Sequence, residues 1–138
     1  MTTTITRENF TKAMREAVAE RGADYVYPVD SVEARETGWR NATPGYDSMG
    51  DASCVYALSD GTPACIIGLA LYKIDPELLA HVSDLYDSAQ AAFRILGVTD
   101  RGLMSAARGA QICQDDGETW GSALEEFEAV FSVEGEEI

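Results

Sequence analysis

The C-terminal part of this chain lacks basic residues: neither lysine nor arginine occurs from Gly109 to Ile138. The same stretch holds nine carboxylates, which supply most of the formal net charge of −14. Large apolar residues are interleaved with these carboxylates, so we expect a folded helix with an acidic outer face rather than a disordered tail. Such a face repels phosphate backbones and anionic membranes and attracts basic partners. We therefore expect no direct binding to nucleic acid or to a membrane.

Two further absences bear on where the protein works. No apolar stretch approaches the roughly 20 residues that cross a bilayer, and residues 1–6 have neither the basic nor the apolar region of a secretory signal. The three cysteines are an odd number and do not form a disulfide framework, so a reducing compartment is the simpler interpretation. These features predict a cytoplasmic protein with no membrane partner.

The length of 138 residues corresponds to one domain, residues 1–138, with room for a hydrophobic core. Thr6, Asp75 and Thr119 are typical N-caps, and Gly22 and Gly97 are typical helix stops. Apolar residues recur at helical spacing between these signals. We expect five helices, over about residues 7–21, 65–73, 76–96, 101–114 and 120–132.

A β-hairpin is predicted between the first two helices. Residues 54–58 and 63–66 favour strand, and Asp60-Gly61 between them is typical of a two-residue turn. That register pairs Tyr56 with Cys65, although Pro63 cannot donate a ladder hydrogen bond and would shorten the second arm. Residues 25–27 are a candidate third strand. The expected fold is α+β and predominantly α, with about five helices packed around a small hairpin or short antiparallel sheet.

Two segments show no periodicity. Residues 30–51 are predicted to form a long loop, and loops of that length are usually functional or mobile. Trp39 and Tyr46 either hold this loop to the body or, if exposed, form a contact surface. Residues 133–138 are expected to be a frayed acidic tail.

Soft metal ligands are few. They are Cys54, Cys65, Cys113 and His81, which together could form a Cys₃His zinc site. No closely spaced pair of the kind usual in structural zinc sites occurs among them, and buried cysteines commonly behave as small apolar residues. A cysteine nucleophile would need His81 as its general base, and no sequence motif shows which of the three cysteines His81 would activate. Gly-rich phosphate loops and a complete calcium loop are also lacking. We expect no cofactor and no catalytic residue.

The segment from Gln111 to Trp120 admits two interpretations. In the structural one it is a corner between helices, with Gly117 in a left-handed conformation and Trp120 in the core. In the functional one it is an exposed recognition edge, with an aromatic anchor and an acidic rim. The candidate interaction residues are Trp39, Tyr46, Asp115, Asp116, Glu118, Trp120, Glu125 and Glu126.

Several segments together resemble a family of small proteins of unknown function encoded by actinobacterial phages and prophages. The segments are residues 25–28, 54–56, 61–71, 110–115 and Trp120. The resemblance spans about residues 24–120 and brings no catalytic residues. It implies a small accessory phage protein made in the cytoplasm of the bacterial host.

These observations favour a non-enzymatic protein-interaction module that acts on an unidentified host protein with a basic or mixed surface. A small zinc- or ligand-binding domain organised by Cys54 and Cys65 is one alternative. A DNA mimic, whose carboxylates imitate phosphates and occupy a nucleic-acid-binding protein, is another. Self-association also remains open, because a small helical domain can bury an apolar stripe against its own copy.

Overall fold

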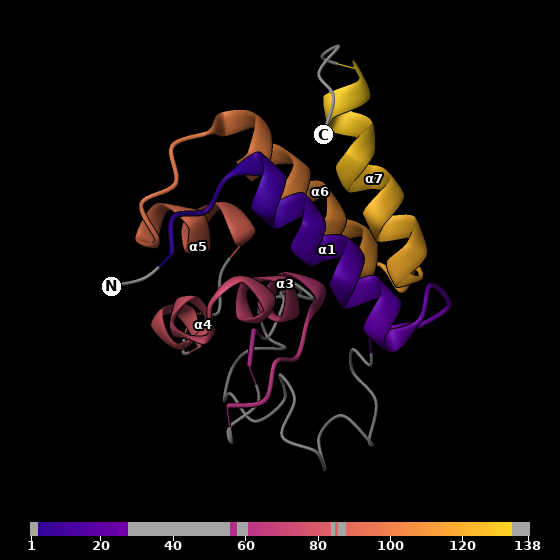
Figure 1. Ribbon diagram of the computed structural model, residues 1–138. Coiled ribbons are helices and arrows are strands. Elements are labelled where there is room, and N and C mark those ends of the chain that lie inside the picture. The colour runs from indigo at the N-terminus through magenta and orange to yellow at the C-terminus, as the bar shows by residue number, and fades with distance from the viewer. Residues whose placement is uncertain (1–2, 28–55, 58–60, 84, 86–87, 134–138) are drawn as a thin grey trace, which may run out of the picture.

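The computed structural model describes residues 3–27, 56–57, 61–83, 85 and 88–133. Within these ranges the chain forms six helices and no β-strand (Figure 1). They are α1 (Arg7–Arg21), α3 (Ile66–Ile74), α4 (Pro76–Val82), α5 (Ala89–Ile95), α6 (Arg101–Asp115) and α7 (Trp120–Val133). The described part is therefore mostly helical, and the prediction of an α+β fold is wrong there.

The expected hairpin is reduced to one isolated antiparallel bridge, between Ala57 and Pro63. The backbone N–H of Ala64 donates to the carbonyl of Tyr56 at 2.9 Å, so the register differs by one residue from the predicted pairing of Tyr56 with Cys65. Proline has no N–H to extend the ladder, and Cys65 already serves as the N-cap of α3. The second arm therefore passes directly into a helix.

Residues 25–27 do not form a third strand either. Val26 makes an isolated bridge to Thr119, at the start of α7. The carbonyls of Ala23 and Tyr25 accept from the backbone N–H groups of Gly121 at 2.9 Å and Trp120 at 2.8 Å. The first N–H groups of a helix have no acceptor within that helix, so this extended segment supplies acceptors for α7.

Local capping signals place α1 where the sequence predicts it. Thr6 and Asn9 form a reciprocal capping box, and the N–H of Gly22 closes the last turn on Val18. The face that carries Phe10 and Met14 is fully buried. The predicted first helix is confirmed.

The single helix expected over residues 76–96 is two helices. Asp75 caps α4 as predicted, but a second N-terminus occurs at Ser88, whose hydroxyl accepts from the N–H of Ala91 at 3.3 Å. The N–H of Ala89 donates to Gln111 Oε1 of α6 at 2.8 Å. The new helix start is stabilised by a side chain distant in sequence, which a local pattern does not reveal.

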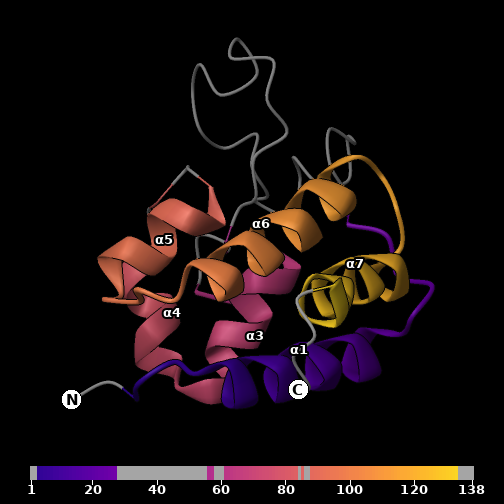
Figure 2. The ribbon, with the colours of Figure 1, turned by 90° about the horizontal axis from the view of Figure 1, so that it is seen from above.

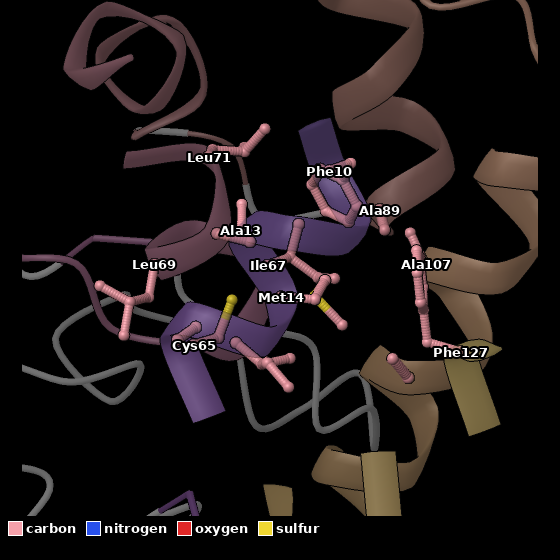
Figure 3. Packing of buried hydrophobic residues seen from close by; sticks show 14 of the residues in the cluster. Phe10, Ala13, Met14, Cys65, Ile67, Leu69, Leu71, Ala89, Ala107 and Phe127 are labelled. Atoms are coloured by element: carbon pink, nitrogen blue, oxygen red, sulfur yellow. The ribbon is translucent and has the colours of Figure 1, made fainter. Parts of the chain in front are cut away.

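Helix α3 lies at the centre of the packing, and its residues 66–71 are all buried. It packs against α1, α4 and α6, and Figure 3 shows its side chains beside those of α1 and near Ala107 and Phe127. Helix α6 packs against α5 and α7, which lie on opposite sides of it (Figure 2). The two ends of α6 therefore lie in different surroundings.

Two buried glutamines connect α6 to the helix starts around it. Gln114 Oε1 accepts from the N–H of Ile66 at 2.8 Å and from the indole N–H of Trp120 at 3.1 Å. Gln111 accepts from Ala89 and donates through Nε2 to the Tyr56 hydroxyl at 3.1 Å. The polar groups of α6 thus satisfy backbone donors that the core would otherwise leave unpaired.

Candidate functional site

The corner where α6 ends and α7 begins gathers the acidic residues that the sequence singled out. We call the set Asp115, Asp116, Glu118, Glu125 and Glu126 the acidic corner. Gly117 makes the turn with a φ of +91°, and the N–H of Glu118 closes on the carbonyl of Cys113 at 3.2 Å. The Thr119 hydroxyl then accepts from the N–H of Ser122 at the start of α7, as predicted.

Four carboxylates of the acidic corner are exposed, and the charge of each raises the pKa of one thiol. Asp116, Glu118, Glu125 and Glu126 are solvent-exposed, whereas Asp115 is half-buried and accepts from Gln114 Nε2 at 3.0 Å. Burial raises the pKa of the half-buried Cys113 thiol, and the charges of the four exposed carboxylates raise that pKa further. Carboxylates from the turn after α6 and from α7 therefore act on the same thiol.

No cation neutralises these four carboxylates within the described part of the chain. The sequence has no lysine or arginine from Gly109 to Ile138. Glu128 of α7 pairs with Arg15 of α1, whose Nε lies 2.7 Å from Glu128 Oε2.

An exposed apolar residue lies beside these charges. Ile112 precedes Asp116 by one helical turn, so the two residues share a side of α6, and Ile112 is 44% exposed. The corner thus combines negative charge with a small apolar contact.

Trp120 is not part of this exposed surface. Its side chain is fully buried, packs edge-on against Tyr25 with ring centroids 4.7 Å apart, and lies under the guanidinium of Arg21. The same guanidinium donates to the carbonyls of Pro63 and Ala64. The interpretation of Trp120 as an exposed aromatic anchor is therefore wrong, and the structural interpretation of this corner holds for Trp120 and Gly117.

The other two aromatic candidates, Trp39 and Tyr46, lie outside the described residues, together with the whole 30–51 segment. Of the predicted tail over residues 133–138, Val133 is the last residue of α7, and the remainder lies outside the described residues.

The three candidate zinc ligands in the described part of the chain do not form a metal-binding group. Cys65 is buried and disulfide-bonded, and its sulfur also accepts from the N–H of Gly68. His81 is exposed on α4, Cys113 is a free thiol beside α7, and Cys54 lies outside the described residues. Among the residues that the structure describes, no group of three metal-ligating side chains forms. The disulfide at Cys65 also departs from the expectation of fully reduced cysteines.

Sequence reasoning missed a groove at the opposite end of α6. Its volume is about 550 Å³, and it is lined by Gln90, Arg94, Val98, Thr99, Arg101, Met104 and Ser105. The available signal was the occurrence of two arginines on either side of the α5–α6 connection in a strongly acidic chain. Without the fold, nothing showed that both would face one hollow.

Comparisons of the chain with protein-family models, curated proteins and solved structures found no match. The resemblance to phage-encoded proteins stays a prediction. Each helix in the described part of the chain is too short or too polar to cross a lipid bilayer.

Proposed function

We propose that this protein is a non-enzymatic interaction module that presents the acidic corner to a basic surface of a partner protein. The observation that carries the proposal is the convergence of four exposed carboxylates around Cys113, with no neutralising cation among the described residues. Complementary charge of this kind speeds the encounter of two proteins and selects the partner more than it adds affinity.

The apolar contribution to such an interface comes from Ile112 rather than from an aromatic anchor. Its exposed side chain lies next to the carboxylates and would be covered by a bound partner. The resemblance to phage-encoded proteins suggests a bacterial host protein as that partner. A surface of this composition favours lysine- or arginine-rich segments of the host protein.

The test compares two variants that remove equal charge from different faces. One neutralises the acidic corner (D116N/E118Q/E125Q/E126Q), and the control neutralises four exposed carboxylates elsewhere (E8Q/E16Q/D24N/E77Q). Each tagged protein is used to capture partners from a bacterial lysate. We expect the wild type and the control to retain the same host protein and the acidic-corner variant to lose it.

Equal retention of the host protein by all three proteins, or equal loss of it from both variants, would contradict the assignment of the acidic corner.

The salt dependence of binding separates the proposed protein interface from phosphate mimicry. A host protein that a DNA oligonucleotide displaces, and that is retained at low salt only, would indicate a DNA mimic. Retention at moderate salt with sensitivity to Ile112→Gln would indicate a protein interface with an apolar contact.

A further inference from the structure

The groove between α5 and α6 is separate from the acidic corner. Its lining comes from Gln90 and Arg94 of α5, from the connection through Val98 and Thr99, and from the first turns of α6. Helix α6 has 15 residues, which places its two ends about 20 Å apart. The Debye length at physiological salt is about 8 Å, so the acidic corner is largely screened from this groove.

Within the described part of the chain, the two arginines of the groove have no acceptor. Of the lysines and arginines that the structure describes, five donate hydrogen bonds to acceptors in the chain; these are Arg7, Arg15, Arg21, Lys73 and Arg108. Arg94, Arg101 and Lys12 make no such bond within the described ranges. Two of these three cations therefore line the same hollow, and both are exposed to solvent.

The carboxylate next to the groove is already engaged. Asp100 accepts from Arg7 Nε at 2.6 Å and from Arg7 Nη2 at 2.9 Å, and its Oδ1 also accepts from the N–H of Leu103. These bonds direct the negative charge of Asp100 toward α1 and its own helix start. Among the described residues, Arg94 and Arg101 thus set the local charge of the groove, despite the net charge of the whole chain.

The rest of the lining suggests a ligand with both a polar and an apolar part. Thr99 and Ser105 supply hydroxyls and Gln90 an amide, whereas Val98 and Met104 supply apolar surface. Guanidinium groups bind phosphate oxygens through paired N–H donors, and two of them match a doubly charged group. The volume of about 550 Å³ is in the range of small-molecule sites.

We propose that this groove binds the phosphate monoester of a small organic molecule, with Arg94 and Arg101 holding the phosphate and Val98 and Met104 contacting the organic body. A carboxylate could use the same donors, but with its single charge it would gain less from two guanidinium groups. The site lies on a different face from the acidic corner, so it stands or fails independently of the proposed function.

The test is an NMR titration of the full chain with phenyl phosphate, inorganic phosphate and benzoate, at low salt and constant pH. The variants Arg94→Gln and Arg101→Gln remove the proposed contacts. Lys12→Gln is the matched control, because it removes from α1 one exposed cation that has no partner in the described ranges. Both arginines are exposed, so the variants should fold, and thermal unfolding of each variant verifies this.

We expect saturable shifts at the groove, with phenyl phosphate binding several-fold more tightly than inorganic phosphate because of the apolar contacts. Each arginine variant should weaken phenyl phosphate binding about tenfold, and Lys12→Gln by less than about twofold. Non-saturable shifts, or equal weakening by all three variants, would overturn the site. Benzoate binding as tightly as phenyl phosphate would overturn the assignment to a phosphate monoester.

Discussion

At the residue scale, three polar side chains are buried among the described residues, and two of them have clear roles. Gln111 and Gln114 pair with backbone N–H groups at the starts of α5 and α3. The third is Thr11 of α1, which is 1% exposed and whose hydroxyl has no hydrogen-bond partner among the described residues. A buried hydroxyl that lacks a partner costs free energy, so Thr11 is a place where the core is not optimal.

Thr11→Val should therefore stabilise the protein. Valine keeps the β-branched shape and removes the unpaired hydroxyl, and we expect the free energy of unfolding to rise by about 1 kcal/mol. Urea denaturation followed by circular dichroism measures this change. Val18→Thr on the same buried face of α1 is the reverse control and should lower the free energy of unfolding by about 1–2 kcal/mol. A loss of stability in Thr11→Val would show that the hydroxyl has a partner.

Cys113 reports the electrostatic potential of the acidic corner. Its pKa is raised first by burial and then by four carboxylates, so neutralising them should lower that pKa and increase the thiolate fraction near pH 8. In D116N/E118Q/E125Q/E126Q, alkylation of Cys113 by iodoacetamide should be faster by about twofold to fivefold at low salt. Mass spectrometry of the Cys113 peptide gives the rate. The control E8Q/E16Q/D24N/E77Q should match the wild type, and equal acceleration in both would contradict a local effect.

At the scale of elements, a close backbone approach positions α3. A Cβ atom built at Gly68 would lie 2.1 Å from the carbonyl oxygen of Tyr56, which is far inside van der Waals contact. This approach lets the short 56–57 segment pack directly on the first turn of α3. Glycine, which has no Cβ, is the residue that permits this close approach.

Gly68→Ala should therefore be strongly destabilising, by about 2–4 kcal/mol, because the obstructing atom is backbone and cannot rotate away. Gly109→Ala is the matched control, since Gly109 is also helical and its added Cβ would meet no atom within 4 Å. At Gly109 the better helix propensity of alanine should raise the free energy of unfolding by about 0.5–1 kcal/mol. Chemical denaturation of both variants tests the pair. If both substitutions changed the free energy of unfolding by similar amounts in the same direction, the close packing at Gly68 would not be the cause of the change.

Helix starts were predictable to different degrees. Thr6, Asp75 and Asp100 cap their helices through bonds to residues two or three positions ahead, and such bonds depend on local sequence alone. The start of α5 also depends on the bond from the N–H of Ala89 to Gln111, 22 residues further along the chain. The apolar periodicity continues across the break between α4 and α5, so the pattern indicated one helix where two exist.

At the scale of the whole molecule, the Arg7–Asp100 ion pair joins the start of α1 to the start of α6. The two residues are 93 positions apart, and their bidentate contact fixes the relative position of two long helices. Hydrogen bonds from Arg7, together with backbone N–H bonds, lower the pKa of Asp100. The carboxyl group therefore binds protons less readily in the folded chain than in the unfolded one.

This difference predicts a contribution to stability that depends on pH. Because the folded pKa lies below the unfolded value of about 3.9, the contribution is complete above that value and is lost as the pH falls through the folded pKa. Asp100→Asn keeps an N-cap but loses the charge, so it should be less stable than the wild type by about 0.5–1 kcal/mol at pH 7.

The gap in stability between Asp100→Asn and the wild type should disappear in strong acid. Thermal unfolding from pH 2 to pH 7 measures it, and the exposed Asp24→Asn serves as the control that should follow the wild-type curve. A gap of constant size at every pH would show that Asp100 acts only through its cap. A gap that widened in acid would contradict the sign of the pKa change.

The sequence by itself determined most of the helices of the described part, their N-caps and the acidic character of the C-terminal third. These features depend on residue spacing and on bonds between near neighbours. Only the tertiary structure decided that the hairpin shrinks to one bridge at Pro63, that Trp120 is buried, and that Arg94 and Arg101 line one groove. Those outcomes depend on how side chains and helices are placed in three dimensions, which the spacing of residue types along the chain does not specify.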